Sequence, residues 1–147
     1  MAPLLDKVFG VLVSASTFHN NRVLLLRRSL EERFKPGSWS IPAGKILPRE
    51  ASLEEAVRRE LYEEAGIHGD VRENIGMRWF ESTYYEQLVH HIQFDFIVMA
   101  HNSNVRLLDK SNMDYLWMPI QQVNRPPVPL DEFTRSVLLK AIRHMRS

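Results

Sequence analysis

The chain contains no cysteine, no marked excess of charge of either sign and no long hydrophobic run. Without cysteine, disulfide frameworks and thiolate metal sites are excluded, and the composition fits the reducing cytoplasm, where we expect the protein. Because 19 basic residues offset 18 acidic ones, the formal charge of +1 gives no global attraction to DNA or to an anionic membrane. The apolar stretches are far shorter than a membrane span, and residues 1–7, MAPLLDK, break their apolar run with charge, unlike a signal peptide.

What the chain does have is the size and composition of one compact domain. Its 147 residues, of which 44% are hydrophobic, predict a single domain covering residues 1–147. Apolar, aromatic and β-branched runs predict strands over residues 8–16, 22–27, 39–41, 71–85, 88–100 and 115–118. Helices are expected between residues 52 and 66 and from about 131 to 145. This order favours an α/β fold in which a mixed sheet packs between helices.

The first helix has clear end signals and an unusual distribution of acidic residues. Ser52 and Glu55 form a capping box, and Gly66 stands where a helix C-terminal glycine belongs. At about 100° per residue, Glu60 and Glu64 fall inside the apolar stripe of this helix. This position is unfavourable for solvated charge, so we expect a positive partner nearby.

Three closely spaced glutamates, Glu60, Glu63 and Glu64, allow two kinds of positive partner. Like charges about 4 Å apart repel by ~4 kcal/mol at an effective dielectric of about 20. The usual explanation for a run of charged residues on a helix is that they form a solvated face. An ion-pair network is a second explanation, because Arg59 reaches Glu63 more easily than Glu64. Mg²⁺ is another, because it prefers oxygen ligands and is held by few carboxylates together with substrate phosphates. We expect positions i, i+3 and i+4 to bring the three carboxylates to one point, but spacing alone leaves the metal site and the ion-pair network equally open.

The segment of residues 44–67, GKILPREASLEEAVRRELYEEAGI, resembles the Nudix box. The residues that match its pattern are Gly44, Glu50, Arg59, Glu60, Leu61, Glu63, Glu64, Gly66 and Ile67. Eight residues rather than the usual seven separate Glu50 from Arg59, and the extra one is identified as Ala51, just before the helix. This departure keeps the glutamate spacing and leaves the pairing of Glu50 with Arg59 to be tested. Residues 37–45 and 115–119 resemble the segments that flank the box in the family, so the resemblance spans most of the chain.

The resemblance implies a Nudix α/β/α sandwich and the Mg²⁺-dependent hydrolysis of a nucleoside diphosphate linked to another group, with Mn²⁺ as a substitute metal. The implied catalytic residues are Glu60, Glu63, Glu64 and Arg59. The implied metal ligands are the carboxylates of Glu60, Glu63 and Glu64 and the Gly44 carbonyl, while Glu50 and Gly66 are implied as structural residues of the box. Such a site suits phosphoanhydride hydrolysis, which requires water in line with phosphorus and neutralisation of phosphoryl charge.

Four further residues are expected to bind substrate. Arg27 and Arg28 end a strand ahead of the box, and a guanidinium suits a polyphosphate, although a surface strand end is an equal alternative. Lys45 is another candidate phosphate contact, and Trp39 offers a face for a nucleobase, although a single aromatic is more often part of a core. Other aromatic candidates are Phe34, Trp79, Phe80, Tyr84 and Tyr85. The candidates for a general base are Asp109, Asp114, Glu81 and Glu86.

The short chain fits a nucleoside triphosphate pyrophosphohydrolase. Hydrolases of nucleotide sugars or ADP-ribose are alternatives, and a non-catalytic module that binds a nucleotide or an RNA end is a third. The Nudix branch that hydrolyses GDP-mannose has a histidine where this chain has Asn112, so we expect phosphoanhydride cleavage rather than glycosyl transfer to water. The expected partner is a nucleotide or nucleotide derivative, with no membrane and no DNA, and the aromatic content would also suit a homodimer.

Overall fold

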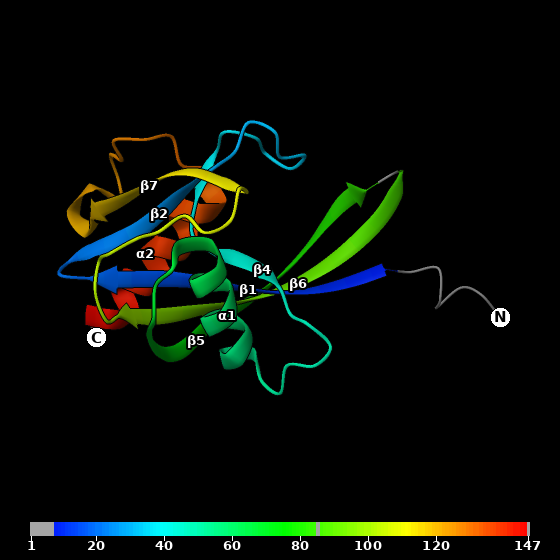
Figure 1. Ribbon diagram of the computed structural model, residues 1–147, viewed down its shortest axis with the longest axis horizontal. Helices are drawn as coiled ribbons and strands as arrows, with labels where there is room; N and C mark the ends of the chain where they lie inside the picture. The colour runs from blue at the N-terminus through cyan, green and yellow to red at the C-terminus, as the bar shows by residue number, and fades with distance from the viewer. Residues whose placement is uncertain (1–7, 85, 147) are drawn as a thin grey trace.

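The computed structural model describes residues 8–84 and 86–146, which form a sheet with a helix on each side (Figure 1). In chain order the elements are β1 (Val8–His19), β2 (Arg22–Arg28), β3 (Trp39–Ser40), β4 (Ala43–Lys45), α1 (Leu53–Ala65), β5 (Gly69–Tyr84), β6 (Gln87–Ala100), β7 (Asn112–Pro119), the short 3₁₀ helix η1 (Ile120–Gln122) and α2 (Glu132–Arg146). None of the helices in this part of the chain is long and apolar enough to cross a membrane.

The seven strands form one mixed sheet built around the long central strand β1. The order along the main path is β3-β2-β1-β6-β5, with β4 paired to β1 and β7 paired to β2. Among the strand pairs within residues 8–84 and 86–146, only that of β1 with β6 is parallel; it runs from Val8 opposite Val89 to Phe18 opposite Met99. The other strand pairs are antiparallel, including the expected β1–β2 and β5–β6 pairs. The expected mixed sheet is therefore confirmed.

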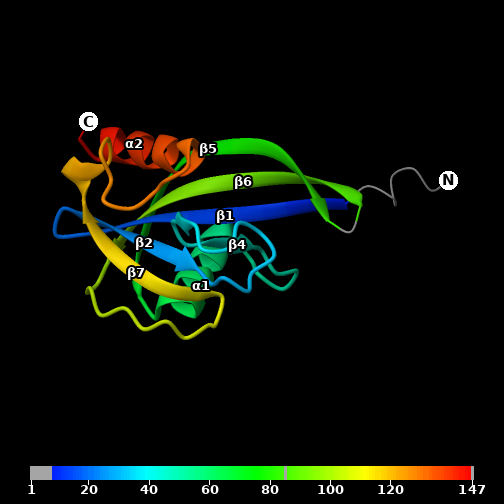
Figure 2. The same cartoon turned by 90° about the horizontal axis from the view of Figure 1, so that it is seen from above.

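The two faces of the sheet carry two separate cores, because side chains alternate between the faces along each strand. One face, called the α2 face, packs against α2 through Phe18, Val23, Leu25, Ile97, Met118, Val137, Leu138 and Ala141, among others. The other, called the α1 face, packs against α1 through Val13, Ala15, Leu24, Leu26, Val57, Leu61, Phe96 and Val98, among others. Figure 2 shows the helices on opposite sides of the sheet. The α/β/α sandwich is confirmed.

Some element boundaries differ from the sequence expectation. Strand β4 was not expected, because Pro42 and Gly44 indicate a loop, yet its backbone pairs with Leu12–Ser14 of β1. Strand β5 starts at Gly69, where pairing with Ala100 extends the strand beyond its apolar part. Strand β7 starts at Asn112 rather than Tyr115 because it follows β2 to its end. Of the aromatic candidates, Tyr85 lies outside the described residues.

Candidate functional site

Helix α1 begins and ends at the residues that the sequence indicates. The Ser52 hydroxyl accepts a hydrogen bond from the Glu55 amide at 3.1 Å, and the Glu55 carboxylate accepts one from the Ala51 amide at 2.9 Å. At the other end Gly66 adopts φ 65°, a left-handed conformation that favours glycine, and its amide donates to the Tyr62 carbonyl at 2.8 Å. These caps fix the rotation of α1 and therefore the direction of its glutamates.

Arg59 is the centre of an ion-pair network at the start of the site. It donates two hydrogen bonds to the Glu50 carboxylate, at 2.8 and 3.0 Å, and a third to the Lys45 carbonyl at 2.7 Å. Glu60 and Glu63 accept further bonds from the same guanidinium at 2.9 and 3.0 Å. The pairing of Glu50 with Arg59 is therefore present despite the eight residues between them. The hydrogen bond from Arg59 lowers the pKa of Glu50, and the bond to Glu50 raises the pKa of Arg59.

Glu60 and Glu64 are half-buried between α1 and the β4 segment, as their place in the apolar stripe predicts. The Glu60 side chain is 14% exposed, and Glu64 accepts a hydrogen bond from the Ala43 amide at 3.2 Å. Burial raises the pKa of Glu60. Burial, together with the charge of Glu60, raises the pKa of Glu64 to about 8. Two neighbouring carboxylates that resist ionisation form an environment in which a cation would be stabilised.

The backbone of Gly44 lies directly against the Glu60 carboxylate. A Cβ atom added at Gly44 would overlap with that carboxylate, so only glycine allows this approach. The backbone of Gly44 thus lies beside Glu60, and the adjoining Ala43 amide bonds Glu64, so β4 and the two half-buried carboxylates share one small region. This donor set of hard oxygens fits Mg²⁺, which is commonly held by one or two carboxylates and completed by water and substrate phosphates.

Glu63 is placed differently from the other two glutamates. Its side chain is 52% exposed and its carboxylate faces Arg59. Among the residues that the structure describes, no group of three or more acidic or histidine side chains has the arrangement of a metal centre. One nitrogen of Arg59 bonds both Glu60 and Glu63, so in this arrangement Glu63 is turned towards Arg59, and the convergence of the three carboxylates on one metal ion stays a prediction.

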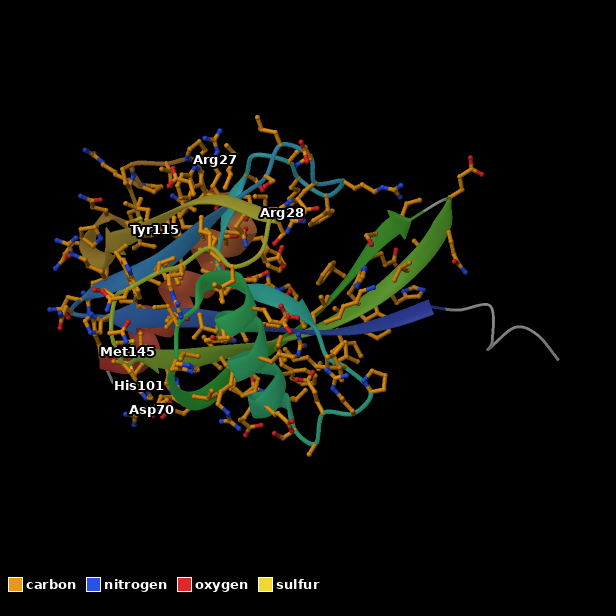
Figure 3. The ribbon with its side chains drawn as sticks, in the orientation of Figure 1. Arg27, Arg28, Asp70, His101, Tyr115 and Met145 are labelled. Carbon is orange, nitrogen blue, oxygen red and sulfur yellow. The ribbon has the colours of Figure 1, made fainter. Side chains whose placement is uncertain are left out.

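Arg28 and Asp109 come close to Glu64 from other elements. The positive charge of Arg28 lowers the pKa of Glu64 and the negative charge of Asp109 raises it, although burial is the larger effect. Figure 3 shows Arg28 at the end of β2. Its guanidinium donates to the Phe34 carbonyl at 2.7 Å, which ties it to the loop of residues 29–38. Arg28 and Asp109 are thus the members of their candidate groups whose charges act on Glu64.

The other base candidates lie elsewhere. Asp114 stands opposite Arg27 in the β2–β7 pair, and Arg27 in turn donates to the Gly37 carbonyl at 3.1 Å. Glu81 lies 3.4 Å from the His90 ring on the β5–β6 hairpin, and Glu86 lies in the turn of that hairpin. The hairpin extends away from α1 (Figure 1). Glu81 and Glu86 are therefore not brought to the site.

The remaining substrate candidates face the other side of the sheet. Arg27 and Trp39 are strand partners, and Trp39 packs against the core of the α2 face, which agrees with the core alternative weighed for it. Lys45 alternates with Gly44 along β4, so its side chain lies on the α2 face next to Gly10. The sequence-derived candidates are therefore divided between the two faces, with Arg28 and the glutamates on the α1 face.

A polar network on the α2 face was missed by the sequence reasoning. The buried carboxylate of Asp95 accepts hydrogen bonds from Ser14 at 2.6 Å, Gln93 at 2.9 Å and Arg78 at 3.4 Å. The Arg78 guanidinium also lies 3.0 Å from the centroid of the Phe133 ring, at the start of α2. The available signal was the alternation of Gln93, Phe94, Asp95 and Phe96, which places two polar side chains on one face of a central strand.

Comparisons with known proteins give one consistent family. A family model described as NUDIX domain matches residues 6–140. Nudix hydrolase 19, chloroplastic, of Arabidopsis thaliana is 47% identical over 78 residues, covering 52% of this chain and 16% of the relative. The NAD-capped RNA hydrolase NudC of Chromobacterium violaceum is 31% identical over 124 residues, covering 84% of this chain and 41% of the relative. The chain thus spans less than half the length of either relative.

Solved structures agree in fold. The MutT protein from Methanosarcina mazei Go1 matches with a TM-score of 0.72 and 29% identity, over 96% of this chain and 98% of the other. The NUDIX domain of Shewanella oneidensis NrtR, solved with ADP ribose, matches with a TM-score of 0.72 and 20% identity, over 95% of this chain and 88% of the other. At 20% identity the second match shows the fold alone.

Proposed function

Because the chain belongs to the Nudix hydrolase family, which acts on phosphoanhydride bonds in nucleoside diphosphate derivatives, we propose that it is a Mg²⁺-dependent nucleoside triphosphate pyrophosphohydrolase. The observation that supports this most strongly is the half-buried pair Glu60 and Glu64 against the backbone of Gly44. Glu60 pairs with Arg59, but in the described part of the chain Glu64 is bonded only by the Ala43 amide. This half-buried carboxylate beside Gly44 favours a divalent cation as its partner.

In this proposal the carboxylates of Glu60, Glu63 and Glu64 and the Gly44 carbonyl would hold the ion. Bound Mg²⁺, or Mn²⁺ in its place, polarises phosphoryl oxygens and lowers the pKa of bound water. Arg59 positions the carboxylate of Glu60 through the bond at 2.9 Å, while Glu50 holds Arg59 from the other side. Arg59 therefore acts on the reaction through Glu60.

Two residues at the α1 face are assigned direct roles. Arg28 binds phosphoryl oxygens, because its charge already acts on Glu64 and a guanidinium can donate two parallel hydrogen bonds to a phosphate. Asp109 accepts the proton of the attacking water, because it is the base candidate whose charge reaches Glu64.

The nucleoside part of the substrate is assigned to the α2 face. Lys45 and Arg27 lie on that face, and the Arg78 guanidinium lies there over the Phe133 ring. We propose that the substrate extends around β4 from one face of the sheet to the other. Its phosphates would then lie near Arg28 and the glutamates, and its base would lie on the α2 face. A few precisely placed polar groups among aromatic rings are typical of a small-molecule site.

A second candidate function is the cleavage of the pyrophosphate of a dinucleotide such as NAD, free or at an RNA end. The observation that favours it is the 31% identity to an NAD-capped RNA hydrolase over 84% of this chain. Both functions use the same glutamates and differ only in the group that occupies the α2 face.

The test is a Mg²⁺-dependent turnover screen with nucleoside triphosphates, NADH, ADP-ribose and GDP-mannose, in which products are separated by chromatography. We expect the wild-type protein to hydrolyse one substrate class of this panel and to release a nucleoside monophosphate. The variant Glu64→Gln should lose that activity. Nucleotide binding without turnover across the whole panel would instead indicate a non-catalytic module and contradict the proposal.

A further inference from the structure

A second depression lies on the α1 face at the opposite end of β1 from the β5–β6 hairpin. It has a volume of about 410 Å³ and is lined by His19, Asn20, Arg22, Ser103 and Trp117. We call it the Trp117 pocket. It is separate from the glutamate site, because His19 lies six residues along β1 from Val13, the partner of Gly44, or about 20 Å at about 3.3 Å per residue.

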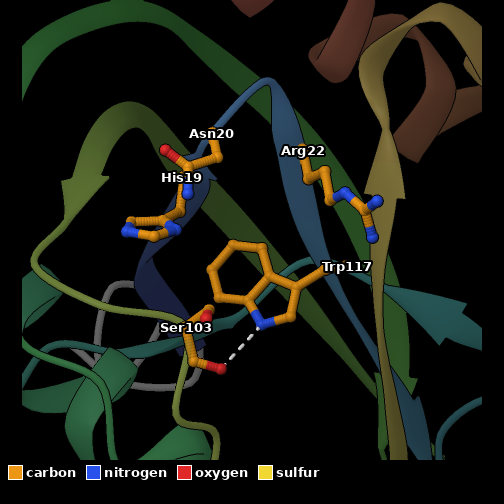
Figure 4. A pocket seen from close by; sticks show the side chains of 5 residues that line it. All are labelled: His19, Asn20, Arg22, Ser103 and Trp117. Atoms are coloured by element: carbon orange, nitrogen blue, oxygen red, sulfur yellow. Dashed lines mark hydrogen bonds between the residues drawn. The ribbon is translucent and has the colours of Figure 1, made fainter.

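The Trp117 indole is the floor of this pocket, and its orientation is fixed. Its N–H donates to the Ser103 carbonyl at 3.1 Å, and its ring centroid lies 6.1 Å from that of His19. In Figure 4 the indole lies between the side chains of His19 and Arg22, with Asn20 at the rim. The indole is half-buried against the core of the α1 face, and the remainder of the ring lines the depression with its polar atom already bonded.

Asn20 and Arg22 are exposed and His19 is half-buried around the ring, so their polar atoms are accessible to a ligand. Within residues 8–84 and 86–146, the side chains of Arg22, Asn20 and His19 make no hydrogen bond or ion pair. Arg22 is held in place only by its backbone, which pairs with His19 and Pro119. An unpaired guanidinium, an imidazole and an amide thus surround one aromatic ring at a rigid strand end.

This combination suits a ligand that joins a flat ring to a negative group. Base–aromatic stacking contributes about 1–3 kcal/mol per base and tolerates different bases, and a guanidinium donates two hydrogen bonds to a phosphate. The volume lies within the range of about 300–1,000 Å³ that is usual for ligand sites. The tight αL turn at Asn20 and Asn21, with φ of 49° and 60°, holds His19 and Arg22 on the same side of the hairpin.

We propose that the Trp117 pocket binds a nucleoside monophosphate unit, with the base stacked on Trp117 and the phosphate held by Arg22 and His19. The unit is either a free nucleotide or one nucleotide of a single-stranded RNA. This site does not rest on the proposed hydrolysis, because it lies apart from the glutamates and needs no metal.

The test follows the indole N–H signals of the full chain by NMR in metal-free buffer. The chain has three tryptophans, so the Trp117 signal is assigned with Trp117→Phe and then followed during titration with AMP, adenosine and an adenosine tetranucleotide. We expect the Trp117 signal to shift saturably with AMP and at least tenfold more weakly with adenosine. Tighter binding of the tetranucleotide than of AMP would identify RNA as the source, and equal binding would identify a free nucleotide.

The test variant is Arg22→Ala. The matched control is Arg143→Ala, which removes an exposed arginine from α2 on the other face of the sheet. Arg22→Ala should weaken AMP binding at the Trp117 signal at least fivefold, and Arg143→Ala should leave it unchanged. Both should keep the melting temperature of the wild type and its turnover of nucleoside triphosphates. A Trp117 signal that ignores AMP up to millimolar concentration, or an unaltered affinity in Arg22→Ala, would overturn the proposal, even if the glutamate site is active.

Discussion

At the scale of single residues, the spacing along α1 was enough to place its acidic side chains. Glu60 and Glu64 follow the apolar stripe set by Leu53, Val57 and Leu61, and both are half-buried. The pairing of Glu63 with Arg59, four residues earlier, was also expected from the spacing, but the contacts that fix Arg59 itself were not. The Glu63 carboxylate faces Arg59, whose own direction depends on Glu50 and on the Lys45 carbonyl.

Replacement of Glu64 by Gln should lower turnover by about 10²-fold or more, because a neutral amide removes a ligand charge beside the developing phosphoryl charge. The fold should survive, since the amide keeps the shape of a buried group that resists ionisation. Steady-state kinetics and thermal melting check the two effects. Glu54→Gln, an exposed change on the same helix, is the matched control, and equal kcat values for the two variants would contradict the role of Glu64.

Replacement of Arg59 by Ala should weaken Mg²⁺ binding by about 10- to 100-fold, as is typical when a residue that orients a metal ligand is removed. It should also destabilise the protein by roughly 1.5–3 kcal/mol, because the Glu50 carboxylate loses its charged hydrogen bonds. Urea unfolding and metal titration measure both. The neighbour Arg58 is exposed, so Arg58→Ala serves as control, and if the two variants behave alike the positioning role of Arg59 is wrong.

At the scale of elements, local signals defined α1 but not its strand neighbours. Ser52, Glu55 and Gly66 set both ends of the helix through bonds between residues close in sequence. Strand β4 depends instead on pairing with β1 some thirty residues earlier, which the surrounding glycine and proline conceal. The parallel pairing of β1 with β6 likewise joins segments some eighty residues apart, beyond the reach of periodicity.

The contact between β4 and α1 predicts a large effect for Gly44→Ala. The added methyl group would overlap with the Glu60 carboxylate and displace either that side chain or the β4 backbone. Turnover should fall at least tenfold, since small displacements of positioned groups are costly to catalysis. Gly76→Ala, at a glycine on the distant strand β5, is the comparison. Wild-type turnover in Gly44→Ala would show that this close approach has no catalytic consequence.

The start of α2 predicts a pH-dependent contribution to stability. Asp131 accepts the Thr134 amide at 2.7 Å and pairs with Lys35 at 2.9 Å. Partial burial acts to raise its pKa, but these bonds outweigh burial and leave the pKa below its ordinary value of 3.8. Asp131→Ala should therefore cost about 1 kcal/mol at neutral pH, as is usual for the loss of a helix N-cap.

The sign of that effect follows from the lowered pKa of Asp131. The stability difference between wild type and Asp131→Ala should be complete above pH 3.8 and should shrink as the pH falls through the lower pKa of the folded state. Urea unfolding at several acidic pH values measures it. A difference that grows on acidification would contradict the assignment of Asp131 as a charged cap.

At the scale of the whole molecule, the sandwich divides the proposed work between its two faces. The glutamates, Arg28 and Asp109 lie on the α1 face, whereas Lys45 and the Asp95 network lie on the α2 face. The order of strands and helices was sufficient to predict the sandwich. The assembly of Ser14, Arg78 and Asp95 was not predictable, since it requires the registers of three strands at once.

The central claim is that Glu60, Glu64 and the Gly44 carbonyl hold a divalent cation. The most direct measurement is an electron paramagnetic resonance titration of the metal-free protein with Mn²⁺, comparing wild type with Glu64→Gln and with the control Glu54→Gln. The account predicts saturable binding to wild type and Glu54→Gln, competed by Mg²⁺, and binding at least tenfold weaker in Glu64→Gln. Equal Mn²⁺ affinity in all three proteins would contradict it.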